Sequence, residues 1–215
     1  AEYVVVSENL CSRIDENTDI KEAAFTVLGS IALHGLRLSE TTLGSKVVVI
    51  GLGVIGQLVS RLAEAQGSEV TGIDPDPERS KYGENFYTSV DDIELKDVDT
   101  VIITAATSSN EPIELATKIA RNKAKIVVIG DIPLNISRND FYYKELELVV
   151  SKSYGPGRYD KQYEALGNDY PIEYVRWTEN RNFEAFTKLL SQKQIHLLDL
   201  VSEEIAFEDA PSVYE

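Results

Sequence analysis

The sequence is poor in the residues that mark several common kinds of protein. It contains no methionine, a single cysteine (Cys11) and two histidines in 215 residues. One cysteine allows neither an intramolecular disulfide nor a cysteine-rich zinc knuckle, so we expect a reducing compartment, the cytoplasm. No stretch approaches the roughly 18 consecutive apolar residues of a membrane-spanning helix, and we therefore expect no membrane partner.

Positive charge is also scarce. Lys and Arg number 21 against 36 Asp and Glu, which gives a formal net charge of −15. A nucleic-acid backbone repels such a surface, because phosphate binding depends on clustered cations, so nucleic acid is not an expected partner. Apolar residues are plentiful by comparison, at 43% of the chain. They are sufficient for the buried core of one large domain or of a domain and a half.

Apolar patterning predicts alternating strands and helices. Residues 19–38 have one wide apolar helical face, and the β-branched run at 46–50 is typical of a strand buried on both faces of a parallel sheet. Further strands are expected at 69–73, 100–103, 125–129 and 146–150, and helices at 55–66, 78–82 and 112–121. This alternation predicts an α/β fold with a doubly wound parallel sheet and right-handed crossovers.

The pattern changes after residue 150. Residues 151–177 show no clean period, 182–191 return to helical spacing, and 197–204 have the composition of a strand. At the other end of the chain, Tyr3–Val6 is a strand-like run, and a capped helix start follows Phe207. Both ends look trimmed, and we expect a truncated domain.

A glycine-rich turn lies between the strand at 46–50 and the helix that follows it. Its sequence is Gly51-Leu52-Gly53-Val54-Ile55-Gly56. Gly51 permits a tight turn, Gly53 lets the backbone approach a pyrophosphate, and Gly56 permits close packing of the helix on the strand. The helix N-terminus directs unpaired N–H groups and a positive dipole end at the phosphates. The turn is therefore predicted to bind the pyrophosphate of a dinucleotide.

A carboxylate supports the same interpretation independently. Asp74 closes the second strand, where its two oxygens can accept both hydroxyls of an adenosine ribose. Because a carboxylate repels a 2′-phosphate, NAD is favoured over NADP. Arg79 has two interpretations of equal weight: it contacts the cofactor, by flanking the adenine or, as the less favoured option, by pairing with a phosphate, or it is a helix-surface cation near Asp76 and Glu78.

Several alternatives accompany this prediction. A phosphate-loop hydrolase is excluded, because Gln57 follows Gly56 and no Lys-Ser or Lys-Thr comes next. A methyltransferase that binds S-adenosylmethionine shares the sheet and the glycine turn and stays open, although residues 104–107 lack the acidic or Asn-Pro-Pro motif of amino methyltransferases. A tight turn without a ligand and a non-catalytic NAD-binding module for regulation or assembly also stay open.

The stretches Ala23–Gly35 and Leu43–Gly56 resemble the cofactor domain of the medium-chain dehydrogenases, the zinc-type alcohol dehydrogenase group. Residues 151–160 and 174–182 are similar to a subgroup often called bi-domain oxidoreductases. The resemblance implies an NAD(P)-binding Rossmann fold and hydride transfer between nicotinamide and a carbinol or carbonyl group. The implied substrate is a small alcohol, polyol or sugar.

The same resemblance assigns further residues to the cofactor. Thr104, Ala105 and Thr107 are expected near its central region, and Gly130 and Asp131 near the nicotinamide. For Asp131, capping of the next turn is the favoured alternative. No catalytic residue is assigned.

The resemblance also bears on zinc. Zinc-dependent members carry a cysteine ligand where Leu28 stands here, so zinc is not expected on this chain. Cys11 is at no ligand position and is expected to be a small apolar filler.

The resemblance further implies pieces of a GroES-like catalytic domain at both ends. The expected division is a catalytic-domain remnant at 1–18, the dinucleotide-binding domain at 19–150, and a loop-rich extension and return segment at 151–215. Such a chain is expected to bind NAD without turnover. Exposed strand edges at its ends make a homodimer a hypothesis.

Tyrosines crowd the region between 142 and 174, and Arg158, Arg176 and Trp177 accompany them. Aromatic faces stack on sugar rings and arginines bind phosphates or carboxylates, so a sugar-binding wall is one interpretation. An interface that covers the edge of the sheet is the commoner one.

Overall fold

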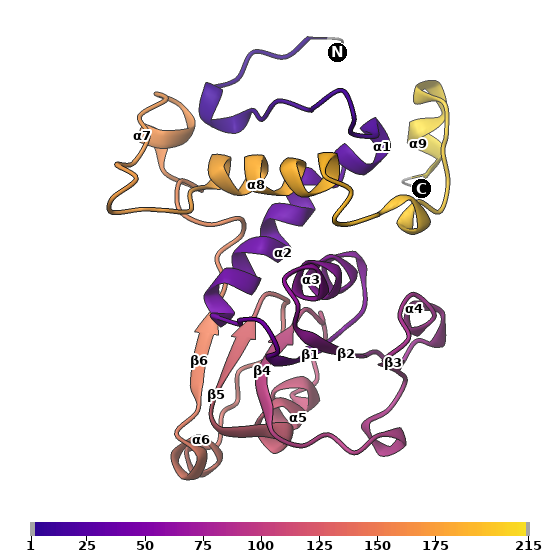
Figure 1. Ribbon diagram of the computed structural model, residues 1–215, viewed down its shortest axis with the longest axis vertical. Helices are drawn as coiled ribbons and strands as arrows, with labels where there is room; N and C mark the ends of the chain where they lie inside the picture. The colour runs from indigo at the N-terminus through magenta and orange to yellow at the C-terminus, as the bar shows by residue number, and fades with distance from the viewer. Residues whose placement is uncertain (1–2, 214–215) are drawn as a thin grey trace.

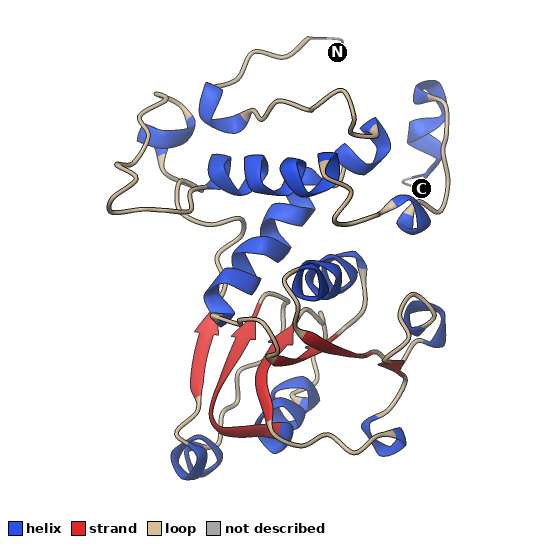
Figure 2. Ribbon diagram, in the orientation of Figure 1, coloured by secondary structure: helices blue, strands red, loops and turns tan. Residues whose placement is uncertain are grey.

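A computed structural model describes residues 3–213, and Figures 1 and 2 show its elements around one sheet. The six strands lie in the order β3-β2-β1-β4-β5-β6, and every neighbouring pair is parallel. Their bounds are β1 Lys46–Ile50, β2 Glu69–Ile73, β3 Phe86–Tyr87, β4 Val98–Ile103, β5 Ala120–Val128 and β6 Glu147–Val150. The strand order reverses between β1 and β4, which is where doubly wound sheets open a crevice at their carboxyl ends. The predicted fold class is confirmed.

Helices cover both faces of this sheet. The α-helices are α1 Ile20–Ala23, α2 Thr26–Ser39, α3 Val54–Ala65, α4 Pro77–Ser80, α5 Glu111–Ile119, α6 Arg138–Lys144, α7 Lys161–Glu164, α8 Glu179–Ser191 and α9 Ala210–Val213. Short 3₁₀ turns are η1 Glu8–Leu10, η2 Val90–Asp92, η3 Leu198–Leu200 and η4 Phe207–Asp209. None of the helices in the described part is long and apolar enough to cross a membrane.

The central strand β1 is buried on both faces, as its β-branched run predicts. Val47 and Val49 belong to the core shared with α2 and α3, whereas Val48 and Ile50 belong to the core shared with α5. This division follows from the two-residue period of a strand. The two cores hold the carboxyl end of β1, and hence the glycine turn, in a fixed place.

A further helix layer lies beyond the carboxyl ends of the strands, where α8 crosses α2 (Figure 1). Gly29 makes the crossing close, because a Cβ at that position would lie 2.2 Å from the Phe186 ring. Phe186 and Leu190 are fully buried in the same core as α2 and α3. The segment after residue 150 therefore shares a core with the sheet layer, and the boundary proposed at 150 stays a prediction.

Two expected strands are wrong. Tyr3–Val6 forms no strand, and residues 197–204 form the turn η3 followed by extended chain without a sheet partner in the described residues. An isolated extended segment leaves its backbone groups to water, so apolar composition alone does not make a strand. The side chain of Val5 is fully exposed.

Smaller differences concern boundaries and Cys11. The helix expected over 19–38 is interrupted at Ala24 and Phe25, and β5 begins at Ala120 rather than at Lys125. Its pairing with β4 shifts between Val98 and Thr100, which accommodates the irregular start. The expected apolar role of Cys11 is wrong, because its side chain is exposed.

Candidate functional site

The turn after β1 can be built only with glycine at its first position. Gly51 has φ +96°, in the left-handed region, and its N–H donates to the carbonyl of Ile73 at the end of β2 (2.8 Å). A Cβ on Gly51 would lie 2.6 Å from the backbone nitrogen of Ala105. Backbone conformation and the approach of the loop after β4 both require glycine here.

The other two glycines differ in what surrounds them. A Cβ on Gly56 would lie 1.9 Å from the carbonyl oxygen of Gly51, so α3 packs directly against the turn. A Cβ on Gly53 would meet nothing within 4 Å. Gly53 is also the N-cap residue of α3, and no side chain of the described residues caps that helix. The first turn of α3 therefore presents backbone N–H groups beside an open space, which is the arrangement that binds phosphate.

Asp74 is joined to the glycine turn. Its carboxylate is buried, with Oδ2 accepting from the Leu52 N–H (2.7 Å) and Oδ1 accepting from the Asp76 N–H (2.9 Å). Each carboxylate oxygen has two lone pairs, so Asp74 can accept further hydrogen bonds. The end of β2 and the turn after β1 thus form one hydrogen-bonded unit.

Arg79 lies beside this unit, exposed on α4. Its Nη1 is 3.5 Å from Oδ2 of Asp74, and its Nε is 3.4 Å from Oδ2 of Asp76. Glu78, the other expected neighbour, pairs instead with Lys81 at 2.6 Å. These contacts are those of a surface cation beside Asp76, as one interpretation of Arg79 expected. A contact of Arg79 with the adenine stays a prediction.

Gln57 is a site residue that sequence analysis missed. Its Nε2 donates to the carbonyls of Leu52 (3.2 Å) and Arg79 (3.0 Å), which ties the glycine turn to α4. Its Oε1 is buried with no hydrogen-bond partner among the described residues. The available signal was an uncharged polar residue directly after Gly56, at a helix position that turns inward.

The loops after β4 and β5 meet the glycine turn. The hydroxyl of Thr104 donates to the carbonyl of Gly51 (2.5 Å), and a Cβ on Gly130 would lie 2.0 Å from the carbonyl oxygen of Ala105. The Thr107 N–H donates to the carbonyl oxygen of Asp131 (2.9 Å). The structure therefore brings all the sequence-predicted positions together at the carboxyl ends of β1, β2, β4 and β5.

The surroundings of Asp131 and Leu28 bear on the roles expected for these two residues. Asp131 is exposed, and its carboxylate accepts no hydrogen bond from the described residues, so capping has no support there. Leu28 is exposed on α2. Within residues 3–213 no group of three or more His, Cys, Asp or Glu side chains could hold a metal ion. The expectation that zinc is absent stays a prediction.

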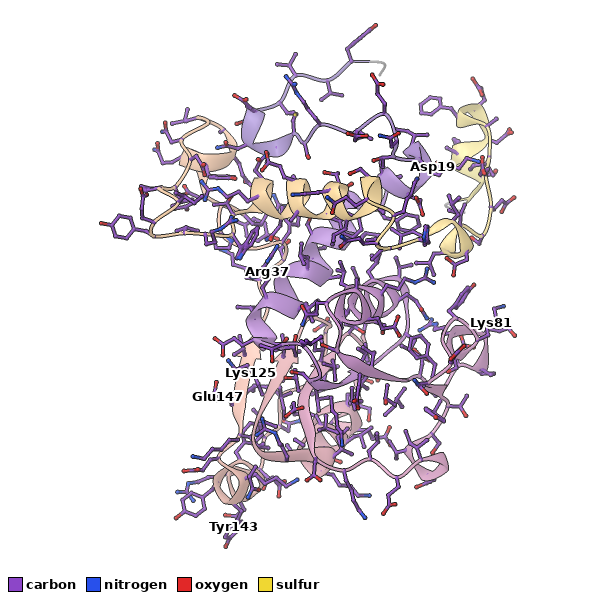
Figure 3. All side chains as sticks on the ribbon, viewed as in Figure 1. Asp19, Arg37, Lys81, Lys125, Tyr143 and Glu147 are labelled. Carbon is purple, nitrogen blue, oxygen red and sulfur yellow. The ribbon has the colours of Figure 1, made fainter. Side chains whose placement is uncertain are left out.

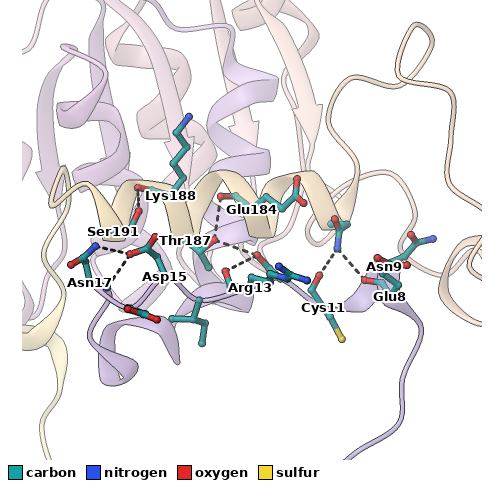
Figure 4. Close-up of a pocket in the computed structure, with 14 residues that line it drawn as sticks. Glu8, Asn9, Cys11, Arg13, Asp15, Asn17, Glu184, Thr187, Lys188 and Ser191 are labelled. Atoms are coloured by element: carbon teal, nitrogen blue, oxygen red, sulfur yellow. Dashed lines mark hydrogen bonds between the residues drawn. The ribbon is translucent and has the colours of Figure 1, made fainter.

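A wide groove of about 980 Å³ lies elsewhere, between α8 and the segment 8–17 (Figure 4). Its lining is polar and includes Asp15, Glu184 and Lys188. None of the sequence-predicted site residues lines it.

The comparisons with known proteins agree with this geometry. Residues 18–140 match the family model for the NAD-binding domain of D-isomer-specific 2-hydroxyacid dehydrogenases. The fold and the glycine turn define an NAD(P)-binding Rossmann domain of a dehydrogenase. The chain belongs to the family of NAD-binding domains that this model describes.

Individual relatives are alcohol and polyol dehydrogenases, which confirms the resemblance to the zinc-type alcohol dehydrogenase group, while the bi-domain subgroup stays a prediction. The 2-dehydro-3-deoxy-L-galactonate 5-dehydrogenase of Pseudoalteromonas atlantica is 26% identical over 178 residues, covering 76% of this chain and 49% of that protein. The (R,R)-butanediol dehydrogenase of Bacillus subtilis is 25% identical over 120 residues, covering 55% of this chain and 34% of that protein. The chain thus spans half or less of the length of these relatives.

Solved structures share the fold. Galactitol-1-phosphate dehydrogenase from Escherichia coli superposes with a TM-score of 0.77 at 21% identity, covering 99% of this chain and 61% of that one. A zinc-binding dehydrogenase from Sinorhizobium meliloti, solved with NADP bound, gives a TM-score of 0.71 at 21% identity, covering 93% and 57%.

Proposed function

We propose that this chain binds NAD(H) across the carboxyl ends of its parallel strands. We propose further that the protein to which it belongs transfers hydride between nicotinamide and a carbinol or carbonyl group of an alcohol, polyol or sugar. The observation that carries the proposal is the buried Asp74 carboxylate, hydrogen-bonded to Leu52 N–H beside the open space at Gly53. The ribose acceptor, Asp74, therefore lies beside the phosphate cradle, which is formed by the backbone N–H groups at the start of α3.

The residues present fit a dinucleotide. The open space where a Cβ on Gly53 would point leaves room for the pyrophosphate against the first turn of α3. Asp74 would accept the ribose hydroxyls, and the loop at Gly130 and Asp131 would hold the nicotinamide half. When bound, nicotinamide accepts or donates the hydride, while the protein's own groups bind and orient it.

NAD rather than NADP is the cofactor that these charges favour. A 2′-phosphate would come close to the Asp74 carboxylate, whose negative charge repels it in a buried setting. The cation that could offset this repulsion, Arg79, already lies near two carboxylates, Asp74 and Asp76. The preference thus follows from the balance of charge at the end of β2.

The substrate class rests on the relatives. Their names describe dehydrogenases of butanediol and of a deoxy-galactonate and a reductase of D-xylulose. An alcohol, polyol or sugar substrate for this protein is consistent with them. The 215-residue chain by itself is proposed to bind the cofactor without turnover, and a non-catalytic NAD-binding module is the alternative function.

Calorimetric titration tests the proposal. NADH, NADPH and S-adenosylmethionine are titrated into the wild type, into Asp74→Ala, and into Asp140→Ala, a matched control on the exposed face of α6. We expect NADH to bind more tightly than NADPH, and Asp74→Ala to weaken NADH at least about tenfold, the value of one charged hydrogen bond. Equal NADH binding by Asp74→Ala, or binding of S-adenosylmethionine in place of NADH, would contradict the proposal.

A further inference from the structure

A second cavity, of about 310 Å³, lies where the chain leaves β6. Its lining includes His34 from α2 and, from the loop-rich segment after residue 150, Lys152, Arg158, Tyr159, Asp160 and Tyr170. The proposed dinucleotide site uses none of these side chains. The cavity thus brings together cationic and aromatic side chains from the tyrosine-rich region of the sequence.

The order of the strands places this cavity at the nicotinamide end of the dinucleotide site. β6 neighbours β5, so the loop at Ser151 lies next to the loop at Gly130. Helix α2 packs against both loops, because a Cβ on Gly35 would lie 2.2 Å from Cδ1 of Ile129 and 3.8 Å from Oγ of Ser151. His34, the preceding residue, faces the cavity. The cavity therefore lies on the opposite side of the site from Asp74.

Two cations and an exposed ring form one wall. The ring of Tyr159 is 65% exposed, with Nζ of Lys152 5.3 Å and the guanidinium carbon of Arg158 4.2 Å from its centroid. Arg158 pairs with Glu164 at 2.6 Å. Lys152 has no ion-pair partner among residues 3–213. An ammonium group without an ion pair thus lies at the edge of an aromatic surface.

The acidic group of the cavity is held by the protein itself. The carboxylate of Asp160 accepts from the Tyr170 hydroxyl (2.5 Å) and from the Gln162 N–H (2.9 Å). These hydrogen bonds, the Tyr170 one first, lower the pKa of Asp160. The charge of Lys152 also lowers this pKa, but the two groups form no ion pair and Lys152 stays exposed.

More positive charge lies just beyond His34. The guanidinium carbons of Arg37 and Arg176 are 3.3 Å and 3.8 Å from the centroid of the Trp177 ring, and Figure 3 places Arg37 where α2 meets this region. Arg37 donates to Oδ1 of Asn182 (3.0 Å), and neither arginine forms an ion pair in the described part of the chain. Burial and the like charge of Arg176 lower the pKa of Arg37 to about 10. Crowded cations of this kind are stabilised by an anion.

We propose that this cavity binds the anionic group and adjoining hydroxyls of a sugar acid or sugar phosphate, the substrate of the proposed dehydrogenase. The inference rests on the proposed function and narrows its substrate class. Lys152 and Arg158 bind the carboxylate or phosphate, and the exposed face of Tyr159 packs against the carbon chain. Of the two cations in the lining, Arg158 is paired with Glu164, whereas Lys152 forms no ion pair in the described part of the chain.

Ligand titrations followed by tryptophan fluorescence test the inference, because Trp177 is the single tryptophan of the chain and lies against Arg37, one helical turn along α2 from His34 of the cavity lining. The probes are gluconate, glucose 6-phosphate and sorbitol; sorbitol carries an alcohol where gluconate carries its carboxylate. We expect the wild type to bind gluconate or glucose 6-phosphate at least tenfold more tightly than sorbitol. The stronger of the two anions identifies the substrate's charged group as carboxylate or phosphate.

Lys152→Met retains the apolar stem and removes the charge, and Lys118→Met on the exposed face of α5 is its matched control. We expect Lys152→Met to weaken the anionic sugar about tenfold and Lys118→Met to leave it unchanged. Equal affinity for sorbitol and the anions, or no effect of Lys152→Met, would overturn the inference. NADH titrations of the same samples keep the two proposals apart, because NADH binding without anion selectivity leaves the proposed function intact, whereas absence of NADH binding removes it.

Discussion

The Leu52 N–H donates a 2.7 Å hydrogen bond to Oδ2 of Asp74 across the gap between two loops. The first loop follows β1 and the second follows β2, so one bond fixes the proposed phosphate cradle relative to the proposed ribose acceptor. Gln57 adds a second link, from Leu52 to the carbonyl of Arg79. The adenosine half of the proposed site is therefore preorganised by the protein before any ligand binds.

Replacement of the carboxylate should change the cofactor preference. In Asp74→Ser the charge that repels a 2′-phosphate is gone, and Arg79 loses one of its two carboxylate neighbours. We expect the ratio of NADPH to NADH affinity to rise at least tenfold, as measured by calorimetry. Adding Arg79→Ala to Asp74→Ser should remove most of the gain in NADPH affinity. An unchanged ratio in Asp74→Ser would show that the carboxylate does not set the preference.

Two glycine substitutions should separate binding from folding. Gly53→Ala places a methyl group in open space, so we expect normal stability and weakened NADH binding. Gly56→Ala places it 1.9 Å from the carbonyl oxygen of Gly51, and we expect the free energy of unfolding to fall by about 1–3 kcal/mol. Denaturant unfolding and NADH calorimetry on both variants check this. Undiminished NADH affinity in Gly53→Ala would contradict the phosphate cradle.

Stability should depend on pH through Glu179. This side chain is fully buried at the start of α8, and neither carboxylate oxygen has a hydrogen-bond partner among the described residues. Burial, followed by the charge of Glu164, raises its pKa from 4.5 to about 7. Between pH 4.5 and about 7 the folded protein therefore keeps a proton on Glu179 that the unfolded chain has released. This contribution to stability is complete below pH 4.5 and is lost as the pH rises to about 7.

The comparison of wild type with Glu179→Gln isolates that effect. Chemical unfolding between pH 4.5 and 7.5 should show the wild type losing on the order of 3 kcal/mol relative to Glu179→Gln. Glu184→Gln, on the exposed face of the same helix, should follow the wild type at every pH. Parallel curves for wild type and Glu179→Gln would show that Glu179 ionises normally in the folded state.

The helix layer formed by α8 should unfold together with the sheet. Phe186 is fully buried against Gly29 of α2, so Phe186→Ala should lower the free energy of unfolding by about 3–5 kcal/mol in a single transition. Thermal unfolding followed by circular dichroism and by Trp177 fluorescence measures this. Two separate transitions, with only one affected, would make the segment after residue 150 an independent unit.

The sequence was sufficient to predict the parallel sheet, because β1, β2, β4, β5 and β6 all contain apolar runs next to helical periods. It could not reveal β3, since Phe86 and Tyr87 are only two residues paired to the edge of β2. It also predicted strands at 3–6 and 197–204, where apolar composition is present but no neighbouring strand is available. Whether a segment forms a strand depends on a neighbouring strand that can pair with it, and a local sequence pattern does not show that neighbour.

The same distinction applies to the site. Glycine positions and Asp74 are recognisable because their spacing along one strand-helix-strand unit is fixed by the fold. Gln57 was missed because its role depends on the carbonyl of Arg79, 22 residues away. The cations around Trp177 come from α2 and from the segment after β6, so only the folded chain brings Arg37 to Arg176.

The position of a bound dinucleotide tests the central claim most directly. A crystal structure of the chain with NADH should show both adenosine ribose hydroxyls about 3 Å from the Asp74 carboxylate oxygens, with the pyrophosphate over Gly53 at the start of α3. Nicotinamide should lie towards Gly130 and the cavity at Lys152. A dinucleotide bound elsewhere, or an adenosine ribose without contact to Asp74, would contradict the account.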